Sequence, residues 1–139
     1  MKGKIAYIAG PIQGYEDEQN YRDVIADILS KRNIGSIDPW KRETVVYDAK
    51  SDSHDKSKIG AFIKMDLSDI SRCDYYIAYL PVLSAGTCME MFYAKMKGVK
   101  TITISKIENP SPWLVYHSDF MIKSINELDE ILGSLTGGK

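Results

Sequence analysis

The chain alternates short apolar runs with longer segments in which apolar residues recur at helical spacing. Short apolar runs bounded by turn residues are typical of strands buried on both faces of a sheet. The pattern predicts such strands at Ile5–Ala9, Ile34–Asp38, Tyr75–Leu80 and Val99–Ile104.

Helical segments separate these strands. Apolar residues at i, i+4, i+7 and i+8 mark one amphipathic helix, at Tyr21, Ile25, Ile28 and Leu29. The same periodicity predicts further helices over residues 58–72, 87–97 and 124–135. Gly98 follows the 87–97 helix as its C-terminal cap. The segment 41–58 is polar and lacks periodicity, so we expect a flexible loop or a lid there.

Strands that alternate with helices predict right-handed β-α-β units and a parallel sheet covered by helices on both faces. The expected fold is a single three-layer α/β domain over residues 1–139, flavodoxin-like or Rossmann-like, with about five strands. Ligands of such folds bind beyond the carboxyl ends of the strands. A site is therefore expected among residues 7–14, 38–40 and 81–90.

Asp66 interrupts an apolar helical stripe. It lies seven residues after Ile59, three after Ile63 and four before Ile70, which places its carboxylate on the face expected to be buried. Burying a carboxylate costs several kcal/mol unless it is paired or hydrogen-bonded. Asp66 is either a site carboxylate or an edge residue that bonds the backbone of a neighbouring loop, and the spacing favours neither.

Glu90 also has two interpretations. Thr87-Cys88-Met89-Glu90 fits the capping-box pattern, in which Thr87 caps the helix and Glu90 bonds back to the Thr87 backbone N–H. The spacing alone favours this structural role. The location favours a functional one, because Glu90 follows the third predicted strand, where the helix dipole is expected to keep a carboxylate ionised. An ionised carboxylate there can act as a nucleophile.

A turn of small residues, Ser84-Ala85-Gly86-Thr87, leads into the predicted 87–97 helix. Its hydroxyl and backbone N–H groups can bind an anion, with Ser84 and Gly86 as the principal candidates. The turn lacks the lysine and the glycine pattern of a P-loop, so it is a weak signal.

The loop after the first strand, Gly10-Pro11-Ile12-Gln13-Gly14, offers further groups. It lacks the glycine spacing of a dinucleotide-binding fingerprint, but Gly10 and the backbone N–H groups of Ile12 and Gly14 can face an anion. Trp40, directly after Pro39, can stack on a planar ligand, although a single Trp is more often part of the core.

Composition narrows the class of partner. The 139 residues carry 18 Lys plus Arg against 19 Asp plus Glu, a formal net charge of −1, which argues against binding polymeric nucleic acid. Two Cys and two His stand at no spacing typical of a metal site or a disulfide framework. No segment reaches the length of a signal peptide or a membrane span. We therefore expect a cytoplasmic protein with no metal and no membrane partner.

Three groups of residues, in their order and spacing, resemble the nucleoside 2-deoxyribosyltransferase family. They are Tyr7 within Tyr7-Ile8-Ala9-Gly10-Pro11, Asp66 within Met65-Asp66-Leu67, and Glu90 within Gly86-Thr87-Cys88-Met89-Glu90-Met91-Phe92-Tyr93-Ala94. The resemblance extends over about residues 4–135 and implies an enzyme that uses no cofactor.

The resemblance also implies three catalytic roles. The glutamate matching Glu90 is the nucleophile that attacks the anomeric carbon of the sugar, and the aspartate matching Asp66 handles the proton of the departing base. The tyrosine matching Tyr7 holds the nucleophile in place. These roles agree with the chemistry, because a double displacement at a glycosidic carbon needs one ionised carboxylate and a second acidic group.

Two further positions distinguish branches of that family. Transferases acting on free nucleosides carry an aspartate six residues before the nucleophile. Here Ser84 stands there, as in the 2′-deoxynucleoside 5′-monophosphate N-glycosidases, in which the serine binds the 5′-phosphate. A carboxylate would repel phosphate, whereas a hydroxyl can donate to it. In those hydrolases a serine of the neighbouring subunit completes the site, and Ser111 matches it, which implies a homodimer. Gln13 departs from the arginine that they carry in the first loop.

Three hypotheses follow, in decreasing order of support. The first is an N-glycosidase that hydrolyses the base–sugar bond of (2′-deoxy)nucleoside 5′-monophosphates through a covalent intermediate at Glu90. The second is a nucleoside 2-deoxyribosyltransferase that exchanges bases on free 2′-deoxynucleosides. The third is a non-catalytic nucleotide-binding or sensor module, in which Glu90 is only a capping residue.

Overall fold

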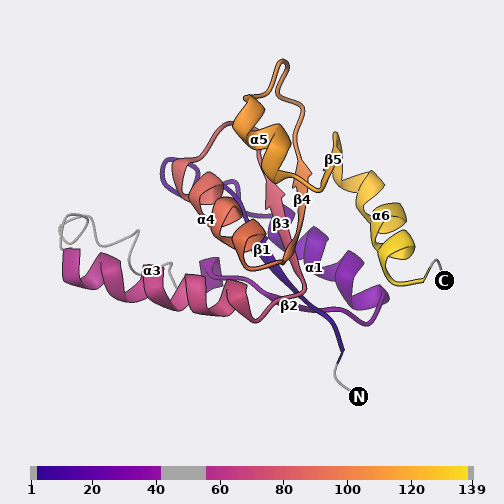
Figure 1. Cartoon of the computed structure of the whole chain (residues 1–139), viewed down its shortest axis with the longest axis horizontal. Coiled ribbons are helices and arrows are strands. Elements are labelled where there is room, and N and C mark those ends of the chain that lie inside the picture. Colours follow the sequence, from indigo (N-terminus) through magenta and orange to yellow (C-terminus); the bar gives the residue numbers. More distant parts are fainter. Residues whose placement is uncertain (1–2, 42–55, 138–139) are drawn as a thin grey trace.

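A computed structural model describes residues 3–41 and 56–137 of the chain. Within these residues, five parallel strands form one sheet in the order β2-β1-β3-β4-β5 (Figure 1). The strands are β1 (Ile5–Ala9), β2 (Gly35–Ile37), β3 (Tyr75–Tyr79), β4 (Lys100–Ile104) and β5 (Phe120–Ile122). The direction of strand addition reverses between β1 and β3, and a ligand site is expected beyond the carboxyl ends of these two strands.

Alternation along the strands gives the two faces of the sheet different side chains. Ile8 of β1 pairs with Ile77 of β3, and both lie in one buried apolar cluster. The preceding residues, Tyr7 and Tyr76, also pair and lie in a second cluster on the opposite face.

Helices cover both faces of the sheet (Figure 1). On the face that carries Ile8 lie α1 (Tyr21–Lys31) and α6 (Leu128–Leu135). On the face that carries Tyr7 lie α3 (Lys56–Ser71), α4 (Ala85–Met96) and α5 (Pro112–His117). The predicted three-layer α/β fold is confirmed. In the described parts of the chain, no helix combines the length and the apolar character that crossing a membrane requires.

Two predicted helix ends are confirmed. Gly98 follows α4 with a φ of 80°, a conformation that glycine adopts without strain. Ser124 and Glu127 form a capping box, in which the Ser124 backbone N–H donates to Glu127 Oε2 at 3.0 Å. The helix predicted from residue 124 begins as a short 3₁₀ helix, η2 (Ile125–Glu127), and continues as α6.

Two short elements, β5 and α5, were not predicted from the sequence pattern. β5 has three residues and α5 has six, too few to display a period of two or of 3.6 residues. The loop predicted for 41–58 ends earlier than expected, because α3 begins at Lys56. Its residues 42–55 lie outside the described part of the chain.

Candidate active site

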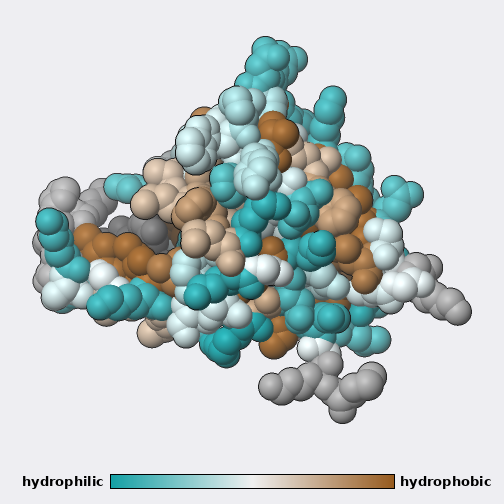
Figure 2. Space-filling model, viewed as in Figure 1, coloured by the Kyte–Doolittle hydropathy of each residue, from teal (hydrophilic) through white to brown (hydrophobic). Residues whose placement is uncertain are grey.

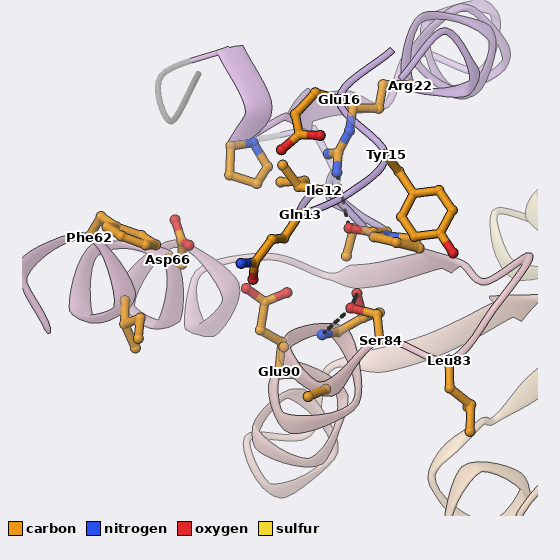
Figure 3. A pocket seen from close by; sticks show the side chains of 18 of the residues that line it. Ile12, Gln13, Tyr15, Glu16, Arg22, Phe62, Asp66, Leu83, Ser84 and Glu90 are labelled. Carbon is orange, nitrogen blue, oxygen red and sulfur yellow. Dashed lines mark hydrogen bonds between the residues drawn. The ribbon is translucent and has the colours of Figure 1, made fainter. Parts of the chain in front are cut away.

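A cavity of about 820 Å³ opens at the carboxyl ends of β1 and β3 (Figure 3). Its walls are the loop that follows β1, one side of α3 and the beginning of α4. The charged residues in this lining are Glu16, Arg22, Asp66 and Glu90. Its position agrees with the predicted location of a ligand site in this fold.

Glu90 lies in the second turn of α4 and not at its start. The helix begins at Ala85, and its N-cap is Ser84, whose Oγ accepts a hydrogen bond from the Thr87 backbone N–H at 3.4 Å. Glu90 Oε1 accepts a hydrogen bond from the Tyr76 hydroxyl at 3.0 Å. The capping-box interpretation with Thr87 as the cap is therefore wrong.

Burial and, after it, the negative charge of Asp66 raise the pKa of Glu90 to about 8. The Tyr76 hydrogen bond, the charge of Arg22 and a hydrogen bond with Tyr7 act in the opposite direction. In this environment Glu90 therefore holds a proton at neutral pH. The expectation that the helix dipole keeps it ionised is wrong, because the dipole acts chiefly within the first turn and Glu90 is desolvated in the second.

Tyr7 and Tyr76 form a stacked pair below Glu90, with ring centroids 5.8 Å apart. Tyr7 is fully buried, and the Tyr76 hydroxyl also lies 2.9 Å from the Thr87 carbonyl oxygen, which accepts from it. Burial, followed by the charge of Glu90, raises the pKa of Tyr76, so its hydroxyl stays protonated and can donate. Sequence reasoning missed Tyr76, although strand register places it beside Tyr7.

Asp66 lies on α3, is 5% exposed and faces the same cavity as Glu90 (Figure 3). Ile59, Phe62 and Ile63 of the predicted apolar stripe also line the cavity, whereas Ile70 is buried in the core. The stripe therefore serves two purposes along one helix. Its C-terminal part packs on the sheet, and its N-terminal part provides an apolar wall beside the two carboxylates.

The first loop contributes both structure and lining. Gly10 and Ile12 line the cavity, and the Gln13 amide extends into it toward Glu90 (Figure 3). At Gly10, a Cβ would lie 2.9 Å from the Tyr79 carbonyl oxygen, so only glycine fits without displacement. Gly14 is outside the lining and has a φ of 85°, which lets the loop turn back as the Tyr15 N–H donates to the Ile12 carbonyl oxygen.

The start of α4 brings hydroxyl and N–H groups to the cavity. Ser84 and Gly86 both line it. The Thr87 hydroxyl donates to Ser84 Oγ at 3.0 Å, which leaves the Ser84 proton available to a ligand. A Cβ at Gly86 would meet open space, and its backbone N–H belongs to the first turn of the helix, which has no acceptor within the helix.

Besides Gly14, two predicted binding residues are not among the described residues that line this cavity. Trp40 is half-buried, and its backbone N–H donates to Asp38 Oδ1 at 3.1 Å, while its neighbour Pro39 lines the cavity. Ser111 is the N-cap of α5, where its Oγ accepts from the Trp113 N–H at 3.2 Å. Neither Trp40 nor Ser111 is among the described residues of the lining.

Arg22 is a buried, charged lining residue that sequence reasoning missed. Its side chain is 1% exposed and its guanidinium is directed toward the cavity (Figure 3). The signal was present, because Arg22 lies three residues before Ile25 and seven before Leu29, on the buried stripe of α1. A charged residue on a buried helical stripe, like Asp66, is a candidate for a functional site.

Residues 6–127 match the family described as Nucleoside 2-deoxyribosyltransferase. The chain has no match among curated proteins.

Three solved structures share the fold. A 2-deoxyribosyltransferase from the psychrotolerant bacterium Bacillus psychrosaccharolyticus superposes with a TM-score of 0.67 at 16% identity, over 90% of either chain. A CMP N-glycosidase from Clostridium botulinum gives a TM-score of 0.60 at 21% identity, over 95% of this chain and 99% of the other. A conserved protein from Enterococcus faecalis V583 gives 0.68 at 17% identity, over 96% and 99%. At these identities the likeness extends to the fold alone.

Proposed function

Because this chain belongs to the nucleoside 2-deoxyribosyltransferase family, whose members are enzymes, we propose that it is an N-glycosidase of (2′-deoxy)nucleoside 5′-monophosphates. The observation that carries the proposal is the shared cavity, in which Glu90 and Asp66 face the hydroxyl of Ser84 at the start of α4. Two carboxylates suit cleavage of a glycosidic bond, and a hydroxyl beside helix N–H groups suits a phosphate.

The two carboxylates can pass one proton between them. Glu90 holds a proton before the reaction begins, and transfer of this proton to Asp66 yields an ionised nucleophile and a neutral acid. The Glu90 carboxylate then attacks the anomeric carbon, the base–sugar bond breaks, and its electron pair leaves with the base, which takes the proton from Asp66. Tyr7 and Tyr76 hold the nucleophile by hydrogen bonds.

Water completes the reaction. It attacks the anomeric carbon of the glycosyl-Glu90 ester, Asp66 accepts the proton of the water, and the sugar phosphate leaves with Glu90 restored as a carboxylate. The proton on Asp66 returns the pair to its initial state. The apolar wall of Ile59, Phe62 and Ile63 offers a surface for the base.

Phosphate binding is assigned to the start of α4. Ser84 can donate its hydroxyl proton, and Gly86 offers a backbone N–H in the first turn, where the helix dipole favours an anion. The backbone N–H groups of Ile12 and Gly14 in the first loop are further proposed donors to the phosphate, and Gly10 lets that loop pass close to Tyr79. Trp40, which follows the lining residue Pro39, is proposed to stack on the planar part of the ligand.

We also propose that the enzyme is a homodimer in which Ser111 completes the phosphate site of its neighbour. Exposed apolar and aromatic side chains gather on α4 and α5, next to Ser111, and Figure 2 shows such side chains over α4. They are Met89, Phe92, Met96, Trp113 and Tyr116, with exposures of 47% to 75%. A surface of this kind supports association with a second copy.

The activity is tested on purified protein with a panel of nucleoside monophosphates and free nucleosides, by chromatography of the released base. We expect release from monophosphates and none after Glu90→Ala. Release from free nucleosides alone, or an unchanged rate in the variant, would overturn the proposal. A competing free base identifies the alternative transferase by formation of an exchanged nucleoside. Saturable binding without turnover identifies a sensor module.

The dimer is tested by mixing two inactive variants, Ser111→Ala and Glu90→Ala. If each site takes Glu90 from one chain and Ser111 from the other, a mixed dimer contains one intact site and activity returns on mixing. Absence of recovery, although sedimentation shows that mixed dimers form, would contradict a shared site.

A further inference from the structure

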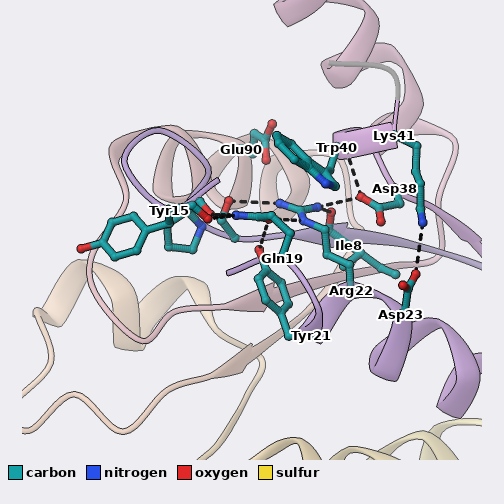
Figure 4. Close-up of polar contacts among 12 residues, drawn as sticks. Ile8, Tyr15, Gln19, Tyr21, Arg22, Asp23, Asp38, Trp40, Lys41 and Glu90 are labelled. Carbon is teal, nitrogen blue, oxygen red and sulfur yellow. Dashed lines mark hydrogen bonds and ion pairs between the residues drawn. The ribbon is translucent and has the colours of Figure 1, made fainter. Parts of the chain in front are cut away.

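Among the described residues that line the cavity, Arg22 is the one with a positively charged side chain, and it is almost completely buried, at 1% exposure. It lies in the first turn of α1, on the opposite side of the sheet from α3 and α4. Figure 4 shows its side chain reaching from α1 past the end of β1 to Asp38. A buried guanidinium is stable only if its donors and its charge are matched, so its partners identify what it does.

Four hydrogen bonds account for most of its five N–H donors. Nη1 donates to the Ile8 carbonyl oxygen at 3.1 Å and to Asp38 Oδ1 at 2.8 Å. Nη2 donates to the Gly10 carbonyl oxygen at 3.3 Å, and Nε donates to Gln19 Oε1 at 2.7 Å. One side chain therefore binds the end of β1, the start of the first loop and the segment after β2.

Gln19 extends this network to the rest of the first loop. Its Nε2 donates to the Pro11 carbonyl oxygen at 2.9 Å and to the Tyr15 carbonyl oxygen at 2.7 Å. Arg22 and Gln19 together hold backbone atoms at both ends of the loop whose Ile12 and Gln13 line the cavity.

The sheet itself explains why these carbonyl groups need a side chain. The pairing of β1 with β2 ends where Tyr7 is opposite Ile37. The carbonyl oxygens of Ile8 and Gly10 lie beyond that point, and Arg22 donates to both. In the register in which the Gly35 N–H donates to the Lys4 carbonyl oxygen, continued pairing would place Pro39, which has no N–H, opposite the Ile8 oxygen. Asp38, the residue after β2, neutralises the guanidinium that takes this place.

The same charge faces two carboxylates. Around Glu90 stand Asp66 from α3, Arg22 from α1, Tyr7 from β1 and Tyr76 from β3, and Glu16 of the first loop lines the same cavity. Asp66 opposes ionisation of Glu90, and Arg22 favours it. Arg22 thereby links the shape of the loop to the charge balance of the carboxylate pair.

We propose that Arg22, held by Asp38 and Gln19, is a positioning residue of the active site that fixes the first loop and supplies the positive charge that lets Asp66 and Glu90 share one cavity. This role deepens the proposed function, and its effects on catalysis rest on that function. Its charge and geometry are testable in the enzyme without substrate.

The deciding experiment titrates Glu90 by NMR of the protein labelled with ¹³C at the glutamate carboxyl groups, with Glu90→Gln to assign the signal. Arg22→Met removes the positive charge and is expected to move the titration to higher pH by about one unit. Asp38→Asn leaves that charge without its counter-ion and is expected to move the titration to lower pH. Opposite shifts support the proposal. A merely structural role would expose Glu90 in both variants and move both titrations to lower pH, which would overturn it.

A second ion pair provides matched controls. Arg32 Nε lies 2.8 Å from Asp129 Oδ1, between the end of α1 and α6 and outside the described cavity lining. Arg32→Met and Asp129→Asn change charge and pairing in the same way and are expected to leave the Glu90 titration unchanged. Shifts as large as those of Arg22→Met and Asp38→Asn would overturn a specific role for Arg22.

Arg22→Lys separates the effect of the charge from the effect of the hydrogen-bond geometry. If Arg22→Met fails to fold, the titrations of Arg22→Lys and Asp38→Asn test the proposal in its place. Lysine keeps the charge but cannot make the four bonds of the fork. We expect a Glu90 titration close to that of the original enzyme and, on monophosphates, a KM raised roughly tenfold as the loop loses its anchor. A titration displaced to higher pH by about one unit would overturn the proposal. If no nucleotide is cleaved but the opposite NMR shifts are observed, the proposed function fails and the positioning role stands.

Discussion

The two faces of the sheet carry side chains of the same strands but serve different purposes. On the face covered by α1 and α6, Ile8 and Ile77 lie in a cluster of mainly aliphatic side chains. On the other face, their neighbours Tyr7 and Tyr76 stand below Glu90, beside a cavity of about 820 Å³. The two-residue period of a strand thus lets each of β1 and β3 contribute to packing on one face and to a polar site on the other.

This difference has an energetic consequence. Apolar burial on the α1 and α6 face stabilises the fold by about 25 cal/mol per Å². The opposite face contains two carboxylates in one cavity, and burial together with Asp66 raises the pKa of Glu90 to about 8. We therefore expect substitutions in the apolar cluster under α1 and α6 to reduce stability. Substitutions of the cavity residues on the other face are expected to reduce activity, some of them with a gain in stability.

Glu90→Ala is expected to have the largest effect of any change on the site face. Removal of a covalent nucleophile lowers turnover by roughly 10³-fold or more. Base release from monophosphates measures the rate, and urea unfolding at pH 8 checks that the variant is folded. Turnover within tenfold of the original enzyme would show that this face carries no nucleophile at Glu90.

Leu132→Ala tests the other face. Leu132 of α6 is fully buried in the cluster that contains Ile8, and its truncation is expected to lower the free energy of unfolding by about 2–5 kcal/mol. Urea denaturation measures the loss. The rate per folded molecule and the Glu90 titration are expected to stay unchanged, and a displaced titration would mean that the two faces are not independent.

Sequence periodicity predicted the layers of the fold because burial on both faces leaves short apolar runs in β1 and β3, and helical spacing separates the strands. It missed β5 and α5, whose three and six residues span fewer than two repeats of the strand and helix periods. It also placed the start of α4 at Thr87, because the Thr-x-x-Glu spacing fits a capping box there. The structure places the cap at Ser84, where the hydroxyl of a small residue accepts from the Thr87 N–H.

For the site, spacing predicted that Asp66 lies on a buried face, and the residues around Tyr7 and Glu90 were found by resemblance. What spacing did not predict is the protonation of Glu90, since that depends on desolvation and on Asp66 across the cavity. Arg22 and Tyr76 were missed for a related reason. Their partners are the end of β1 and a helix far away in sequence, which only the assembled sheet brings together.

Glu90→Gln is expected to stabilise the protein at alkaline pH. The folded state holds the Glu90 proton up to a pKa of about 8, whereas the unfolded chain releases it near 4.5. Stability of the original protein therefore falls as pH rises through this window, and glutamine, which cannot ionise, avoids the loss. The variant is expected to gain on the order of a few kcal/mol at pH 9 and little at pH 5.

Urea unfolding at the two pH values measures this gain, and Glu130→Gln on the exposed side of α6 is the control for the same change of charge. The control is expected to behave alike at both pH values. An equal effect of Glu90→Gln at pH 5 and pH 9 would contradict a buried, protonated Glu90.

The smallest effect is expected from removing the hydroxyl group of Tyr76, and its neighbour in β3, Tyr75, serves as the control. Tyr76→Phe removes the hydroxyl that donates to Glu90 Oε1 at 3.0 Å, and the pKa of Glu90 is expected to rise by up to about one unit. In the proposed mechanism the carboxylate pair must hold one proton, so kcat/KM falls at alkaline pH as Glu90 loses it. This alkaline limb is expected to move to higher pH together with the pKa of Glu90. Tyr75→Phe removes the same group one residue away, where the side chain belongs to the face of α1 and α6, and is expected to leave the limb in place. Both tyrosines are buried in the same strand, but of the two only Tyr76 donates a hydrogen bond to the Glu90 carboxylate. Equal shifts of the limb in both variants would therefore mean that its position depends on the stability of the strand and not on the hydrogen bond to Glu90.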